Sequence, residues 1–233
     1  MIIAGIQKLT LIDYPEKIAC TLFLHGCNFR CGFCHNPELV IKQPEKIYTE
    51  KEIFDFLEKR KQYLDGVCIT GGEPLLSLDK NFLRQIKNLG YKIKVDTNGS
   101  FPEKLKEIID EGLVDFISID IKGSKEKYKK IINAEVDLNK IEESFRTAHN
   151  FGNYEFRTTI IEEFHDADEI RKVGEWINET CGGKPKKYYL QGFKNNGKFI
   201  DENYKMKKDT SENYLNELKK IADKYFEFVG VRK

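Results

Sequence analysis

The most constraining feature of this sequence is a regular alternation of short apolar runs and longer amphipathic stretches. Runs of strand length predict strands at residues 18–24, 66–70, 91–96, 114–121, 154–161, 187–192 and 226–231. The run at 91–96 alternates, which predicts one wetter face. Helical spacing of apolar residues predicts helices at 49–63, around 82–87, and at 102–112, 138–149, 167–180 and 212–225. Six strand–helix units in series predict a parallel sheet, either open and doubly wound or closed into a full or partial βα-barrel.

Composition narrows the class of protein. The alternation runs on without a linker or a low-complexity segment, so we expect one domain over residues 1–233. Lys and Arg total 39 against 38 Asp and Glu, and this net charge of +1 gives no basic surface for nucleic acid. A mean hydropathy of −0.54 and the lack of an apolar run of about 18 residues argue against a transmembrane helix. The first residues do not resemble a secretory signal, so we expect a cytoplasmic protein.

Three of the six cysteines, Cys27, Cys31 and Cys34, lie within one short loop after the first predicted strand. Thiols stay reduced in the cytoplasm, so this group indicates metal or redox chemistry before a disulfide. Offsets of four and three residues allow one loop to surround a single centre with three sulfur atoms. The remaining cysteines stand alone in apolar or segment-end contexts and are expected to be packing residues: Cys20, Cys68 and Cys181.

Spacing alone leaves three interpretations of the cysteine loop. A zinc site would take the three sulfurs and a nitrogen from His25 or His35. A thioredoxin-like redox pair would use Cys31 and Cys34, although such a pair normally opens a helix and has no third cysteine four residues upstream. An iron–sulfur cube normally takes four cysteines, so three would leave one iron open for another ligand.

Further motifs follow the predicted strands, at the position where ligands bind in parallel α/β sheets. Gly71, Gly72 and Glu73 follow the second strand and form either an ordinary glycine turn or an edge that a ligand can approach closely. The spacing of a phosphate-binding loop is absent here.

Two carboxylates end the third and fourth strands. Asp120 lies in an apolar run, where a buried carboxylate needs a cation or donors, although a surface ion pair with Lys122 is the plain alternative. Asp96 precedes the hydroxyl of Thr97, and carboxylate and hydroxyl oxygens suit a hard cation. On the fifth strand, Arg157 would suit a ligand carboxylate or would pair with a neighbouring glutamate.

Three other residues are expected to be structural. His149 and His165 have no ligand-like neighbours in the sequence, so we expect solvated or capping side chains. Trp176 lies on the apolar face of a predicted helix and is expected in the core.

The C-x3-C-x2-C spacing, with Phe33 directly before the last cysteine, resembles the signature of the radical S-adenosylmethionine (radical SAM) enzymes. Segments 13–17, 26–28 and 34–38 resemble the activating enzymes of glycyl-radical enzymes. The sequence is most similar to activating proteins of anaerobic ribonucleoside-triphosphate reductase, and is also similar to pyruvate formate-lyase activating enzyme. The resemblance covers about residues 10–195, and it implies a core of about 15–195 with an extension of about 196–233.

This resemblance implies an α/β fold of the partial (β/α)6, TIM-like barrel type. Cys27, Cys31 and Cys34 would hold a [4Fe-4S] cluster whose open iron binds the amine and carboxylate of S-adenosylmethionine (SAM). One electron would cleave the S–C5′ bond of SAM and give methionine and a 5′-deoxyadenosyl radical. That radical would take a hydrogen atom from a glycine of a partner, expected to be anaerobic ribonucleotide reductase. The expected electron donor is flavodoxin or ferredoxin, and no side chain is required as a general acid or base.

The same resemblance assigns residues to the cofactor site. Contacts to SAM are implied for Phe33, Gly71, Gly72, Glu73, Asn98, Asp120, Lys122, Arg157, Thr159 and Leu190. A monovalent cation beside the cofactor is implied for Asp96, Thr97 and Asp120. Phe193 departs from the pattern, because pyruvate formate-lyase activating enzyme has a histidine there. The alternative functions are a radical SAM enzyme for a small molecule, such as a modified-nucleoside precursor, and a non-catalytic zinc-binding module.

Overall fold

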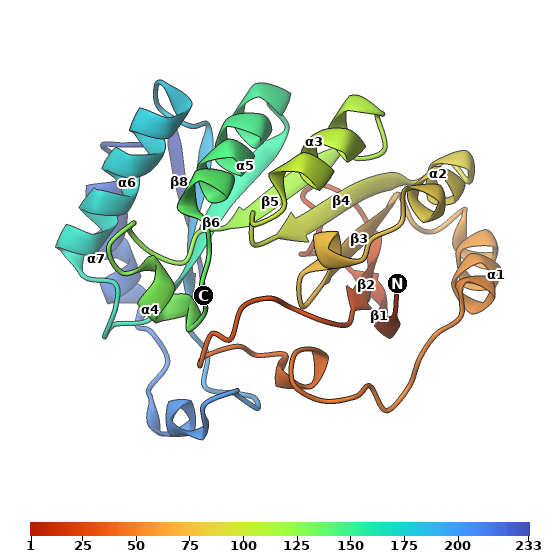
Figure 1. Ribbon diagram of the computed structural model, residues 1–233, viewed down its shortest axis with the longest axis horizontal. Helices are drawn as coiled ribbons and strands as arrows, with labels where there is room; N and C mark the ends of the chain where they lie inside the picture. Colours follow the sequence, from red (N-terminus) through yellow and green to blue (C-terminus); the bar gives the residue numbers. More distant parts are fainter. The chain divides into compact units, whose positions relative to one another are not determined.

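The computed structural model describes residues 1–233, and the chain divides into two compact units. The first unit comprises Met1–Asn28, Asn36–Thr97 and Glu103–Ile117. The second unit comprises Phe29–His35, Asn98–Pro102 and Ser118–Lys233. Strands and helices alternate in both units (Figure 1). The expectation of one domain over residues 1–233 stays a prediction.

The first unit is built on strands that are neighbours in the chain and also in the sheet. Its elements are β1 (Ile3–Thr10), β2 (Ala19–Leu24), η1 (Pro37–Leu39), α1 (Glu50–Arg60), β3 (Gly66–Gly71), η2 (Pro74–Leu76), α2 (Lys80–Asn88), β4 (Lys92–Thr97) and, except for its first residue, α3 (Pro102–Asp110). β1 pairs antiparallel with β2, whereas β2, β3 and β4 are parallel. β2 and β3 are almost wholly buried, which explains why each is a continuous apolar run.

Local sequence signals set the helix ends of the first unit. Thr49 caps α1: its hydroxyl accepts a hydrogen bond from the Glu52 N–H at 3.2 Å. The Glu52 carboxylate accepts one from the Thr49 N–H at 2.8 Å, which completes a capping box. Gly112 follows α3 with a φ of +66°, the left-handed conformation typical of a residue just past a helix end.

β1 lies outside the predicted strands. Its sequence, IAGIQKLT, mixes apolar and polar residues without alternation, and only its terminal residues Ile3 and Thr10 are buried. β4 also differs from expectation, because only Lys92 of its supposedly wetter face is exposed. Lys94 and Asp96 of that face are buried and form an ion pair with each other. Mutual neutralisation therefore permits two charged side chains inside the unit.

The second unit continues the alternation. β5 (Phe116–Asp120) begins in the first unit and ends in the second. The following elements are α4 (Tyr128–Ile132), α5 (Leu138–Phe151), β6 (Tyr154–Ile160), α6 (Ala167–Cys181), β7 (Lys187–Gly192), η3 (Glu202–Met206), α7 (Glu212–Ala222) and β8 (Phe228–Arg232). β6, β7 and β8 are parallel neighbours. α5, α6 and α7 lie side by side along these strands (Figure 1).

The core of the second unit confirms the prediction for Trp176, which is 4% exposed and contacts the rings of Tyr128 and Phe145. Every predicted strand and helix is present, with ends shifted by a few residues. The short helix α4 is an addition that its lysine-rich sequence did not suggest. The α/β class is therefore confirmed. Among the helices of this chain, none combines the length and the apolar character that crossing a membrane requires.

Candidate functional site

Gly71, the last residue of β3, and Gly72 directly after it allow direct backbone contact with the end of β2. The Gly72 N–H donates a hydrogen bond to the Leu24 carbonyl at 2.9 Å, and the Glu73 N–H donates one to the Gly26 carbonyl at 2.8 Å. A Cβ at Gly71 would lie 2.2 Å from the Leu24 oxygen, and a Cβ at Gly72 would lie 2.1 Å from the Gly26 oxygen. The glycines are thus required by a backbone contact beside the first cysteine of the loop.

Glu73 is fully buried next to this contact. Its carboxylate accepts hydrogen bonds from the Leu75 N–H at 3.0 Å and from the Thr97 hydroxyl at 2.7 Å. The side chain therefore links the end of β3 to the end of β4, which orders two strand ends at one edge of the first unit.

Asp96, at the end of β4, has a basic neighbour that the sequence analysis did not single out. Lys94 is 1% exposed, and its ammonium group contacts the Asp96 carboxylate. The Cys68 thiol lies 3.8 Å from the same carboxylate. A fixed positive charge therefore already faces one of the two carboxylates of the predicted cation site, and that site stays a prediction.

In the second unit, Cys31 and Cys34 lie on one tight turn. The Cys34 N–H donates a hydrogen bond to the Cys31 carbonyl at 3.0 Å. Two further backbone bonds hold this turn, from the Arg30 N–H to the Ile132 carbonyl at 2.9 Å and from the Asp201 N–H to the Gly32 carbonyl at 3.0 Å. The thiols are thus presented by a loop fixed on both sides.

An aromatic cluster packs on the same loop. The Phe33 ring meets the Tyr204 ring edge-on at a centroid separation of 6.0 Å, and Tyr204 also contacts Phe193 and Phe199. The His35 ring lies 5.6 Å from that of Phe193. Phe193, which departs from the histidine of pyruvate formate-lyase activating enzyme, is therefore part of this cluster. The cluster also gives the segment after β7 a contact with the cysteine loop.

Charged side chains lie at the end of β5. Asp120 forms ion pairs with Arg157 of β6 and with Lys122, whose Nζ lies 3.5 Å from the carboxylate. Burial would raise the pKa of Asp120, but the two positive charges hold it well below its usual range. Burial raises the pKa of the Cys31 thiol to about 11, against the opposing charge of Lys122. A positive charge therefore acts directly on one cysteine of the loop.

The other predicted cofactor contacts are placed as follows. Asn98 is buried, and its side-chain oxygen accepts hydrogen bonds from the Ser100 N–H at 2.9 Å and the Ser100 hydroxyl at 2.6 Å. Thr159 is partly buried on β6, and Leu190 is fully buried on β7. These roles in cofactor binding stay predictions.

His165 is a residue whose importance the sequence did not indicate. Of the two expected roles, the solvated one is wrong, because His165 is fully buried, whereas its bonds to the backbone of Ile161 and Lys122 agree with a capping role. Its partners lie on two different loops, and no local spacing reveals them. His149 accepts or donates a bond to the Tyr154 hydroxyl at 2.8 Å.

The side chains present fit an iron–sulfur cluster. All six cysteines are thiols in this structure, and cysteine thiolates are the usual ligands of such clusters. His25 and His35 each place Nε2 against a backbone carbonyl, of Lys42 at 2.7 Å and of Lys194 at 2.8 Å. No group of three or more His, Cys, Asp or Glu side chains is gathered for a metal ion. The chemistry of the donor set, rather than a preformed cage, supports the cluster.

Comparison with known proteins adds a family and a fold. The family model described as the radical SAM superfamily matches residues 21–175. A Methanocaldococcus jannaschii protein, named for glycyl-radical enzyme activation, is 33% identical over 99% of this chain and 95% of its own length. Pyruvate formate-lyase-activating enzyme of Clostridium pasteurianum is 29% identical over 75% of each chain.

Among solved structures, Streptococcus suis SuiB bound to S-adenosylmethionine matches with a TM-score of 0.61 at 14% identity. The match covers 91% of this chain but 48% of SuiB, so the chain spans about half the length of that protein. At this identity the likeness concerns the fold alone. It agrees with the partial TIM-like barrel that the resemblance to radical SAM enzymes implied.

Proposed function

Because this chain belongs to the radical SAM superfamily, we propose that it activates a glycyl-radical enzyme by forming a radical on a glycine of that partner. The superfamily uses a [4Fe-4S] cluster and SAM, and the chain is accordingly an oxidoreductase. The proposal of a glycyl-radical partner is supported by a relative of that name over almost the full length of both chains.

The observation that supports the proposal most directly is the charge at the cysteine turn. Cys31 is buried, and the ammonium group of Lys122 acts on its thiol. Cys27, Cys31 and Cys34 would hold the cluster, and metal binding would replace the thiol protons. A fixed positive charge would offset part of the negative charge that thiolate ligation brings into a buried loop.

When bound, the cluster and SAM would supply reductive cleavage of the S–C5′ bond, with a 5′-deoxyadenosyl radical as the oxidant of the glycine. The chain would provide orientation and exclusion of water. Lys122 would bind the carboxylate or ribose of SAM, and Arg157 would keep Asp120 ionised beside it. The aromatic cluster, through Phe33, would exclude water from one side of the cysteine turn.

The finer parts of the proposal concern partners and ions. Anaerobic ribonucleotide reductase is the proposed partner, with flavodoxin or ferredoxin as reductant, in the cytoplasm, where thiols stay reduced.

A monovalent cation at Asp96, Thr97 and Asp120 is also part of the proposal. Replacing potassium and sodium by a bulky organic cation should then weaken SAM binding. Equal binding in both buffers would remove the cation from the proposal.

The main experiment is an anaerobic reconstitution with iron and sulfide, followed by reduction and addition of SAM. We expect 5′-deoxyadenosine from the wild type and none from Cys31→Ala. With the anaerobic reductase present, we expect a glycyl radical signal in electron paramagnetic resonance. 5′-Deoxyadenosine without a glycyl radical would favour a small-molecule substrate. Tight zinc without a cluster would support the zinc module and refute the proposal.

A further inference from the structure

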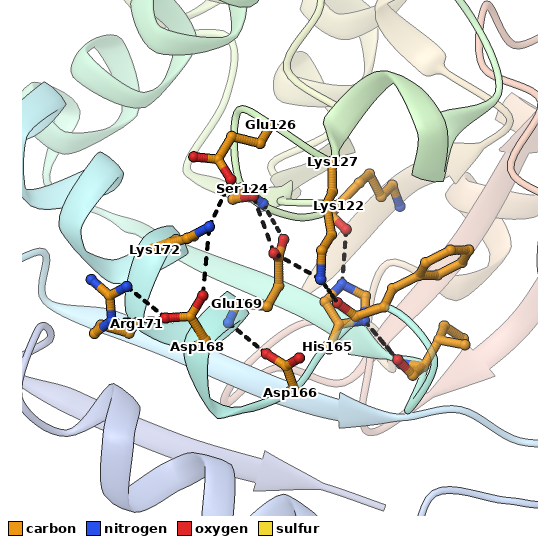
Figure 2. A network of polar contacts seen from close by, with 12 residues as sticks. Lys122, Ser124, Glu126, Lys127, His165, Asp166, Asp168, Glu169, Arg171 and Lys172 are labelled. Carbon is orange, nitrogen blue, oxygen red and sulfur yellow. Dashed lines mark hydrogen bonds and ion pairs between the residues drawn. The ribbon is translucent and has the colours of Figure 1, made fainter.

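The segment that follows β5, residues 122–127, is fastened to the start of α6 by a buried carboxylate (Figure 2). Glu169 is 1% exposed, and its carboxylate accepts hydrogen bonds from the Ser124 N–H at 2.6 Å and the Ser124 hydroxyl at 3.1 Å. The Lys127 ammonium group lies 3.3 Å from the same carboxylate. The Glu169 side chain thus binds the segment at two residues, Ser124 and Lys127.

His165 holds the beginning of the same segment (Figure 2). Its Nδ1 accepts a hydrogen bond from the Ile161 N–H at 3.0 Å, so Nε2 has the proton and donates it to the Lys122 carbonyl at 2.9 Å. Burial lowers the pKa of His165, which keeps the ring neutral and suits this arrangement. The backbone of Lys122 is therefore tied to the end of β6.

The segment also packs closely against its surroundings. A Cβ at Gly123 would lie 2.4 Å from the Ile131 side chain and 3.0 Å from the Glu169 carboxylate, so a larger residue there would push one of these side chains away. The anchor is ordered in turn, because the Glu169 N–H donates a hydrogen bond to the N-capping carboxylate of Asp166 at 2.8 Å. The segment and its anchor form one rigid piece of the second unit.

The side chain at the start of this rigid piece is the one whose charge acts on Cys31. Lysine has a long, flexible side chain that loses much conformational entropy when it is held in one place. A Lys122 on a mobile loop would have to lose that freedom, and that of its backbone, upon binding SAM. A preordered backbone removes the second part of this cost.

We propose that Glu169 and His165 are positioning residues for SAM, which act by fixing the backbone of Lys122 so that its ammonium group stays beside Asp120. This inference rests on the proposed function. Neither residue is assigned a contact with the cofactor, and neither belongs to a motif found in the sequence.

The first experiment measures the order of the segment in the full chain without cofactor. In Glu169→Ala, we expect the Ser124 amide to exchange with deuterium about ten- to a hundredfold faster, because it loses a hydrogen bond to a charged acceptor. Glu169→Gln keeps an oxygen acceptor and should restore part of the protection. Lys172→Met is the matched control, because it removes the 2.7 Å pair with Glu126, an exposed link between the same two elements. Unchanged exchange in Glu169→Ala would overturn the inference.

The second experiment measures equilibrium SAM binding to the anaerobically reconstituted protein. We expect about tenfold weaker binding in Glu169→Ala and His165→Gln, and an intermediate value in Glu169→Gln. In the double variant with Lys122→Met, the loss from Glu169→Ala should largely disappear, because the two residues act through one contact. Simple additivity, or wild-type affinity in Glu169→Ala, would overturn the inference.

The two experiments separate this inference from the proposed function. A wild type that binds a cluster and SAM, with Glu169→Ala equal to it, contradicts only the positioning role. A wild type that binds no SAM contradicts both, whatever the exchange data show. If Glu169→Ala does not fold, Ser124→Ala can replace it, because it removes only the hydroxyl bond of Ser124 to Glu169. Amide exchange should then be faster and SAM binding weaker than in the wild type, each by a smaller factor than in Glu169→Ala.

Discussion

Replacing Gly72 by alanine tests the contact between the end of β3 and the cysteine loop. The new Cβ would lie 2.1 Å from the Gly26 oxygen and 3.1 Å from the Cys27 Cβ, whereas real Cβ contacts essentially never fall below 3.0 Å. The two backbone segments must therefore separate by about 1 Å. This movement breaks the hydrogen bond from the Glu73 N–H to the Gly26 carbonyl, now 2.8 Å. We expect a loss of about 2–4 kcal/mol in the free energy of unfolding, from overpacking and one lost hydrogen bond.

Urea unfolding of the chain without cofactor measures this loss, and iron content after reconstitution measures its effect on the site. We expect less iron per chain in Gly72→Ala, because Cys27 moves with the segment. Gly183→Ala is the control: its Cβ meets nothing within 4 Å and its backbone is not left-handed, so stability should change by less than about 0.5 kcal/mol. Wild-type stability and iron content in Gly72→Ala would refute the backbone-contact explanation.

Three further predictions concern the second unit. Burial lowers the pKa of His165, so the neutral ring contributes fully to stability above about pH 6.5, and this contribution is lost as pH falls toward the lowered pKa. The urea midpoint of the wild type should therefore fall with pH in this range, and that of His165→Gln should fall less. Arg232→Met should lower the free energy of unfolding in urea by about 3–5 kcal/mol, because the 2%-exposed Glu155 carboxylate loses hydrogen bonds of 2.9 and 2.7 Å. Equal stability of the variant and the wild type would contradict this prediction. Tyr204→Ala should lower the free energy of unfolding by about 3–5 kcal/mol and slow the loading of the cluster. Tyr204→Phe keeps the ring contact with Phe33 and should load the cluster at the wild-type rate. Equal loading rates in the two variants would contradict a role of the aromatic cluster in loading.

The parts of the site that the sequence predicted are those encoded by local spacing. Cys27, Cys31 and Cys34 are recognisable because their offsets of four and three lie in one loop. The sequence also singled out Gly71 and Gly72, but a residue without a side chain allows the close approach of a ligand and of another backbone segment equally well. The sequence therefore indicated the position of Gly72 without the backbone contact that requires a glycine there.

The parts that the sequence did not reveal depend on long-range contacts. Glu169 lies 45 residues from Ser124, and His165 lies 43 residues from Lys122, so no window of sequence contains either pair. Lys94 was assigned to a wetter face because alternation records polarity but not pairing, and Asp96 neutralises it inside the unit. The overall α/β architecture was predictable because periodicity and helix caps are local.

The packing of the aromatic cluster on the cysteine turn also has a consequence for biosynthesis. His35 and its partner Lys194 are separated by 159 residues, so the turn leaves the ribosome long before its cover is made. At about 5–20 residues per second, the turn is without this aromatic cover for roughly 8–30 s in the growing chain. Cluster delivery during that interval would meet a turn without its aromatic cover, whereas in the finished protein Tyr204 packs against Phe33 on one side of the turn.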